Sequence, residues 1–182
     1  NLKNVDQVLV TTPSAYSYIK QYHKNVNILS IASNFIKINF EDNYEYDFLF
    51  NGSLSNPNDR QDIIEILTKI NKKYKLCIIG NNWVKSYLGD NYNLLKNSIY
   101  GFVEYRNIKN WYKKSKIIID HGNIHTTEFG SVNSRVFDSI ASNRLVITNN
   151  IVGNREIFKN DLDLYYNYDD VVNIYEKYKD KT

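Results

Sequence analysis

Short apolar segments of strand length recur along the chain, and most are followed by a segment with helical periodicity. Seven such segments are QVLVTT, VNILSIA, DFLFNG, KLCIIG, YGFV, KIIIDHG and RLVITN. Their apolar residues do not alternate with polar ones, which is typical of strands buried on both faces. The pattern therefore predicts an α/β fold, a doubly wound and mostly parallel sheet covered by helices on both faces.

The predicted helices lie between these strands. The strongest is NDRQDIIEILTKINKKY, in which we expect Asn58 or Asp59 to cap the N-terminus; the others are SAYSYIKQYH, NIKNWYKKS, SRVFDSIAS and DDVVNIYEKYK. The apolar face of the strongest helix consists of Ile63, Ile66, Leu67, Ile70 and Tyr74. In doubly wound sheets, ligands bind beyond the carboxyl ends of the strands, so the loops that follow strands are the places to search for a site.

Composition and charge exclude several classes of protein. The 23 basic and 20 acidic residues are spread along the chain and give a net charge of +3, which is too small and too scattered for a nucleic-acid-binding face. No stretch approaches the ~20 apolar residues of a membrane span, and no signal-peptide pattern opens the chain. The single cysteine, Cys77, lies in an apolar strand, so there is no disulfide framework. We therefore expect a cytoplasmic protein, free or at the inner face of the membrane, with no nucleic-acid partner and no membrane span.

The loop FNGSLSNPNDR follows the third strand and opens the strongest helix. Gly52 permits close backbone approach, Ser53 offers a hydroxyl, and Arg60 stands in the first helical turn, where free N–H groups favour an anion. These residues predict a phosphate-binding loop, with a capped turn and an exposed Arg60 as the alternative. The chain contains neither a Walker A motif nor a G-x-G-x-x-G motif, so nucleotide binding of those kinds has no support.

A second polar loop, DHGNIHTTEFGSVNSRVFDS, follows a later strand. His121 and His125 would suit a metal only if both lay on a helix, and Gly122 in a loop after a strand argues against that arrangement. No G-x-S-x-G motif supports a serine hydrolase. We therefore predict neither a metal site nor a hydrolytic serine in this loop.

The helix after this loop carries an arginine and an acid one turn apart. Ser134 is its expected N-cap, and Arg135 follows, where it can lean towards an anion at the helix end. Asp138 lies on the same face, and its carboxylate can accept two hydrogen bonds from vicinal hydroxyls such as those of a ribose. The alternative is a surface ion pair between Arg135 and Asp138.

Several of these segments, taken in order, resemble the C-terminal half of GT-B glycosyltransferases. The segments are FLFNGSLSNPNDR, KLCIIGNNW, YGFVEY, SKIIIDHG, SRVFDSIASNRLVITNN and NREIF. They are most similar to the glycosyl-transferase group 1 and spore-maturation-type enzymes, whose late motif reads roughly Arg-x-Phe-Glu-x-x-Ala-x-Gly. The resemblance implies a Rossmann-like nucleotide-sugar-binding domain in residues 41–182, with residues 1–40 as the tail of a preceding N-terminal domain and its linker. We expect the rest of that domain to lie outside this chain, which contains no methionine.

The resemblance also implies a binding site for a nucleotide-sugar donor. Asp138 falls on the family's ribose-binding acid, Arg135 on the arginine of the late motif, and the segment from Val103 to Tyr105 on the region that contacts the base. The implied donor-binding residues are Gly52, Ser53, Arg60, Val103, Tyr105, Glu128, Ser134, Arg135 and Asp138.

Some positions depart from the family pattern. Asp138 replaces a glutamate, Ser53 replaces an arginine, and Asn143 replaces a glycine, which a left-handed conformation would tolerate. Related glycogen-synthase-like enzymes carry a second glutamate where this chain has Gly130, and Glu128 lies nearby but out of register.

The implied function is metal-independent transfer of a sugar from a nucleotide-diphosphate sugar to a glycan, lipid or protein acceptor, with no cofactor. Arg60, Arg135 and helix N-termini would stabilise the departing diphosphate. Two alternatives stay open, namely a non-catalytic binding module of GT-B descent and a sugar-nucleotide hydrolase or epimerase.

Overall fold

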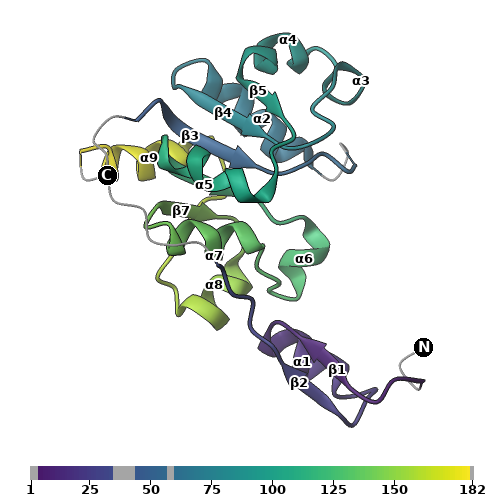
Figure 1. The fold of residues 1–182 in the computed structure, drawn as a ribbon. Helices are drawn as coiled ribbons and strands as arrows, with labels where there is room; N and C mark the ends of the chain where they lie inside the picture. Colours follow the sequence, from purple (N-terminus) through teal and green to yellow (C-terminus); the bar gives the residue numbers. More distant parts are fainter. Residues whose placement is uncertain (1–3, 35–43, 57–59, 181–182) are drawn as a thin grey trace.

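A computed structural model describes residues 4–34, 44–56 and 60–180 of the chain (Figure 1). Its strands are β1 (Val8–Val10), β2 (Val26–Ile28), β3 (Tyr46–Asn51), β4 (Leu76–Ile79), β5 (Ile99–Gly101), β6 (Ser115–Asp120), β7 (Leu145–Thr148) and β8 (Asp163–Leu164). Its α-helices are α1 (Pro13–Ile19), α2 (Gln61–Asn71), α3 (Lys85–Leu88), α4 (Asn91–Leu95), α5 (Tyr105–Lys113), α6 (Ile124–Glu128), α7 (Ser134–Ala141), α8 (Ile151–Phe158) and α9 (Tyr168–Tyr178). The seven predicted strands and five predicted helices are confirmed, whereas β8, α3, α4, α6 and α8 were not predicted.

Six strands form one parallel sheet in the order β5-β4-β3-β6-β7-β8. Counted from β3, this is the order of a doubly wound Rossmann-like sheet, in which the first strand of each half lies in the middle. β3 and β6 are therefore the neighbours at which the winding direction reverses. Ligands of such sheets bind at this point, beyond the carboxyl ends of the two strands.

Helices cover both faces of the sheet, as the strand pattern predicts (Figure 1). Phe48 and Phe50 of β3 point into a core with α2 and α9, while Leu49 between them points into a core with α5 and α7. Cys77 is fully buried in the second core, as expected for a small apolar residue. Burial on both faces explains why the strands show no polar alternation.

The first part of the chain forms a separate two-stranded parallel sheet, β1 with β2, and the helix α1. Figure 1 shows this unit beside α8. The Thr12 hydroxyl donates to the main-chain oxygen of Phe129 at 2.7 Å, and the main-chain N–H of Ser14 donates to the Glu156 carboxylate at 3.0 Å. The predicted boundary after residue 40 falls within residues 35–43, outside the described residues. Within the described ranges, no helix is long and apolar enough to cross a membrane.

Two helix starts differ from the sequence prediction. Helix α2 has Arg60 at its N-cap position, and the predicted caps Asn58 and Asp59 lie outside the described residues. Helix α7 has Asn133 as its N-cap, so the prediction of Ser134 is wrong. The Asn133 backbone is extended, and Ser134 is the first residue with helical geometry.

Candidate functional site

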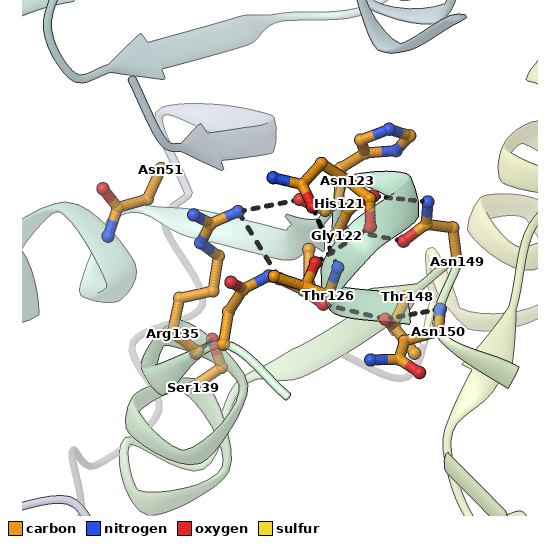
Figure 2. Close-up of polar contacts among 12 residues, drawn as sticks. Asn51, His121, Gly122, Asn123, Thr126, Arg135, Ser139, Thr148, Asn149 and Asn150 are labelled. Atoms are coloured by element: carbon orange, nitrogen blue, oxygen red, sulfur yellow. Dashed lines mark hydrogen bonds and ion pairs between the residues drawn. The ribbon is translucent and has the colours of Figure 1, made fainter. Parts of the chain in front are cut away.

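Two arginines meet at the point where the winding of the sheet reverses. Arg135 reaches from the first turn of α7 towards the end of β6 (Figure 2). Its Nη1 lies 3.4 Å from Oδ1 of Asp120 and donates to the main-chain oxygen of His121 at 3.5 Å. Its guanidinium carbon lies 5.6 Å from the centroid of the Phe50 ring, in a cation–π contact. The guanidinium is therefore held between the ends of β3 and β6.

Arg60 approaches the same place from the N-cap position of α2. Its Nη1 is buried and has no hydrogen-bond partner within the described part of the chain. Burial lowers the pKa of Arg60, and the neighbouring charge of Arg135 lowers it further. The group still carries its charge, because the guanidinium of arginine is not deprotonated in proteins. A buried cationic donor without a partner is unfavourable unless a ligand supplies the acceptor.

Gly52 makes room for Arg135. A Cβ atom at Gly52 would lie 3.1 Å from Nη2 of Arg135 and 3.0 Å from the Phe50 ring, tighter than ordinary contact. The carbonyl oxygen of Gly52 accepts a hydrogen bond from the Trp83 indole at 2.7 Å. The Ser53 hydroxyl oxygen accepts from the main-chain N–H of Asn81 at 2.9 Å, so both predicted residues of this loop are tied to the loop after β4.

His121 is buried beside the two arginines and belongs to a hydrogen-bonded chain. Its Nδ1 lies 3.0 Å from the Tyr165 hydroxyl, which donates to the main-chain oxygen of Asp120 at 3.0 Å. The other ring nitrogen, Nε2, lies 3.3 Å from Oδ2 of Asp62. The hydrogen bond from His121 lowers the pKa of Asp62, although partial burial opposes this shift.

Asp138 lies one turn after Arg135, but the two side chains do not form the surface pair that was the sequence alternative. Arg135 pairs with Asp120, and only 3% of Asp138 is exposed. Oδ1 of Asp138 accepts hydrogen bonds from the Ser33 hydroxyl at 2.5 Å and from the Tyr105 hydroxyl at 2.9 Å. Burial and the neighbouring Asp138 carboxylate raise the pKa of Tyr105. Two hydroxyl groups therefore already bond to one oxygen of the carboxylate that the resemblance assigns to the ribose.

A pocket of about 320 Å³ opens between the loops that follow β3, β4 and β5. It is lined by three predicted donor-binding residues, Ser53, Val103 and Tyr105, and by Phe102. The Phe102 side chain is largely exposed and forms an apolar wall. The structure thus brings residues from two separate predicted loops into one cavity.

Gly130 replaces the second glutamate of the glycogen-synthase-like pattern for a steric reason. Its φ is +67°, and a Cβ atom there would lie 2.8 Å from Cγ1 of Val152. A side chain at this position would require Val152 or its surroundings to shift. Asn143 has a φ of +56°, which confirms that it takes the left-handed conformation usually given to glycine.

Glu128 and Ser134 do not line the pocket of about 320 Å³. Glu128 is exposed at the end of α6 and lines a different pocket, of about 500 Å³, with Asn149 and Val152. Ser134 is exposed at the start of α7. His125 belongs to α6, but its side chain lies outside the described residues. Among the described residues, no cluster of three or more histidine, cysteine or acidic side chains is placed to hold a metal.

Sequence reasoning missed the residues that hold Arg135 in place. Asp120 is fully buried, and its carboxylate accepts hydrogen bonds from Thr148 and Asn133. The loop after Asp120 is braced by Asn149, whose amide exchanges two hydrogen bonds with the backbone of Gly122, at 2.9 and 3.0 Å. The sequence feature that could have indicated Asp120 is its position as the single acid at the end of the otherwise apolar strand KIIID.

A family model described as glycosyl transferase-like matches residues 60–182. The chain belongs to this family. The match covers α2 to the C-terminus and includes Arg60, Arg135 and Asp138. No curated protein matches the chain.

Solved structures of GT-B glycosyltransferases share the fold of this family member. AviGT4, a glycosyltransferase involved in avilamycin A biosynthesis, superposes with a TM-score of 0.58 at 10% identity over 92% of this chain and 53% of its own. The lipopolysaccharide outer core galactosyltransferase WaaB gives 0.56 at 9% identity over 94% of this chain and 51% of its own. TarM gives 0.55 at 19% identity over 97% of this chain and 36% of its own.

The chain spans about half the length of AviGT4 and WaaB and about a third of TarM. At these identities the likeness concerns the fold alone. The predicted resemblance to the C-terminal half of a GT-B glycosyltransferase is confirmed for family and fold.

Proposed function

We propose that this chain is the donor-binding half of a glycosyltransferase, and that it binds a nucleotide-diphosphate sugar at the junction of β3 and β6. The observation that carries the proposal is the pair Arg60 and Arg135, in which Arg60 keeps a buried guanidinium nitrogen without a partner. Two like charges held together at the ligand-binding edge of a Rossmann-like sheet favour an anion with two charged groups, such as a diphosphate.

The remaining parts of the donor have places beside this pair. The pocket lined by Val103 and Tyr105 is suited to the base, because it is concave and partly apolar. Asp138 is suited to the ribose, whose two hydroxyls would replace the hydroxyls of Ser33 and Tyr105 that now bond to its carboxylate. Donor binding would therefore displace Ser33 from the carboxylate.

In the proposed reaction, the bond between the sugar and the diphosphate breaks with its electron pair going to the diphosphate, the acceptor oxygen bonds to the sugar, and the proton of the acceptor hydroxyl passes to a base or to the departing diphosphate. Negative charge then grows on the diphosphate, and the two guanidinium groups stabilise it without a metal. Removing either arginine should cost about 2–4 kcal/mol of transition-state stabilisation. The acceptor, a glycan, lipid or protein, would be bound largely by residues outside this chain.

The test is calorimetric titration of the chain with UDP, GDP and ADP, first without metal and then with magnesium. We expect one nucleotide to bind without metal, and binding to fall at least tenfold in Arg60→Met and in Arg135→Lys. Arg155→Met is the matched control, because Arg155 is exposed on α8. Equal binding by Arg60→Met and wild type would contradict the proposed diphosphate site.

One alternative has a specific observation in its favour. The hydrogen bonds from Ser33 and Tyr105 to Asp138 are consistent with a non-catalytic module in which this carboxylate no longer binds a ribose. In that case none of the three nucleotides binds to the folded chain, and Ser33→Ala does not restore binding. Turnover of a sugar nucleotide without acceptor would instead indicate a hydrolase or epimerase.

A further inference from the structure

The guanidinium of Arg135 is held on one side only. Nη1 faces Asp120 and the main-chain oxygen of His121, whereas Nη2 faces Gly52. Within the described part of the chain, Nη2 and Nε have no hydrogen-bond partner. These are the donors that remain for a ligand, and they lie on the side where the loop after β3 leaves the sheet.

Asp120 is itself fixed from two further elements. Oδ2 accepts a hydrogen bond from the Thr148 hydroxyl of β7 at 2.8 Å, and Oδ1 accepts from the Asn133 amide before α7 at 2.7 Å. Thr148 is buried and Asp120 has no exposed surface, so water does not compete for these bonds. The carboxylate therefore has one orientation, which its neighbours determine independently of Arg135.

A buried carboxylate at the end of an apolar strand needs a reason, because burying a charge is costly even when it is paired. Thr148 and Asn133 satisfy two of its acceptor sites, and the contact with Arg135 at 3.4 Å is long for an ion pair. Such a contact orients the guanidinium without using all of its donors.

We propose that Asp120 is a positioning residue, which holds Nη1 of Arg135 so that Nη2 and Nε face the diphosphate of the donor. This inference rests on the proposed function. Asp120 does not touch the donor, and its own charge works against anion binding. Its contribution is the fixed orientation of Arg135, whose long side chain would otherwise lose rotamer freedom on binding.

Two substitutions at Asp120 separate orientation from charge. In Asp120→Asn the remaining oxygen still accepts from Asn133 and Arg135, and the new amide donates to the Thr148 hydroxyl, which can rotate to accept. In Asp120→Ala every one of these bonds is lost. If Asp120 acts by orienting Arg135, Asp120→Asn should keep its affinity for anions and Asp120→Ala should lose it. If Asp120 acts only through its charge, both variants should bind anions more tightly.

The experiment is calorimetric titration of the chain with inorganic pyrophosphate and with UDP, GDP and ADP. We expect Asp120→Asn to bind at least as tightly as wild type, and Asp120→Ala to bind about 10-fold more weakly, which is the size of loss seen when the partner that orients a metal-ligating side chain is removed. Thr148→Val, which keeps the carboxylate but loses one of its tethers, should fall between them. Asp161→Ala is the control, because Asp161 is an exposed acid after α8.

A measurement without ligand adds a second readout. In nitrogen-15 NMR spectra of the arginine side chains, the Nη groups of Arg135 should rotate slowly in wild type and in Asp120→Asn, and rapidly in Asp120→Ala. A merely structural Asp120 would change the stability of the chain but not this rotation. If Asp120→Ala does not fold, Thr148→Val gives the same two readouts.

The outcomes separate this inference from the proposed function. Wild-type affinity in Asp120→Ala, or tighter binding in both Asp120 variants, overturns the positioning role and leaves the donor site standing. Absence of pyrophosphate and nucleotide binding in wild type overturns both.

Discussion

The carboxyl ends of β3 and β6 are neighbours in the sheet, yet the chain treats them differently. After β6, Asp120 and Arg135 are both held by other groups. After β3 the chain leads into α2, where Arg60 has a buried nitrogen without a partner. Arg135 is thus held by other side chains and backbone of this protein, whereas Nη1 of Arg60 is not.

This difference indicates which half is preorganised and which half depends on the ligand. A preorganised group contributes to affinity because the entropy cost of fixing its conformation is not incurred again when the ligand binds. A buried donor without a partner lowers stability, and this is common where function conflicts with folding. The same type of residue, arginine, should therefore have opposite effects on stability on the two sides.

The largest expected effect comes from replacing each arginine with methionine, which keeps the aliphatic bulk. Arg135→Met leaves Asp120 buried without its cation and should cost about 3–5 kcal/mol of unfolding free energy. Arg60→Met removes an unsatisfied donor and a charge that repels Arg135, and should stabilise the chain by about 1 kcal/mol. Urea denaturation followed by circular dichroism measures both, and both variants should lose pyrophosphate binding.

A destabilising Arg60→Met would show that Arg60 has a favourable partner and would remove the contrast between the two sides. Arg155→Met again serves as the control, with an expected change within about 0.5 kcal/mol for an exposed site.

The sequence predicts the sheet well because its strands are short, apolar and buried on both faces. Their period and their flanking loops are local properties, so β3, β4, β6 and β7 are all found. The short helices α3, α4 and α6 were missed because four or five residues carry too little periodicity. β8 has only two residues, too few for any strand pattern.

The site was predicted less completely because its contacts join distant parts of the chain. Ser33 lies 105 residues before Asp138, and no local pattern connects them. Asp120 and Thr148 are 28 residues apart and meet only because β6 and β7 pair. Even the cap of α7 follows from tertiary structure, since the Asn133 side chain bonds to Asp120 and not to its own helix.

A second contrast concerns two glycines with similar backbone conformation, one in the braced loop after β6 and one at the end of β5. Gly130 and Gly101 have φ of +67° and +75°. A Cβ at Gly130 would meet Val152 at 2.8 Å, whereas a Cβ at Gly101 would meet nothing within 4 Å. Alanine should therefore cost about 3 kcal/mol at Gly130, from strain and overlap together, and about 1–2 kcal/mol at Gly101, from strain alone.

Thermal unfolding of the two alanine variants measures this difference directly. Equal melting temperatures would mean that α8 moves away freely, and the loop after β6 would then not be the rigid side of the site. Equal melting temperatures would also mean that a glutamate could occupy the position of Gly130.

The smallest expected effect concerns the contact between Oδ2 of Asp62 in α2 and Nε2 of His121 after β6, which links the two sides. The hydrogen bond from His121 lowers the pKa of Asp62 in the folded chain, so the pair stabilises the fold above the unfolded pKa of about 3.9. This contribution is lost as the pH falls through the lower, folded value. Because Asp62 is largely exposed, Asp62→Asn should cost no more than about 0.5 kcal/mol at pH 7, and this cost should be smaller at pH 3. Urea denaturation at both pH values, with Asp161→Asn as the control, measures it; a cost that is unchanged at pH 3 would mean that Asp62 acts through packing and not through its charge.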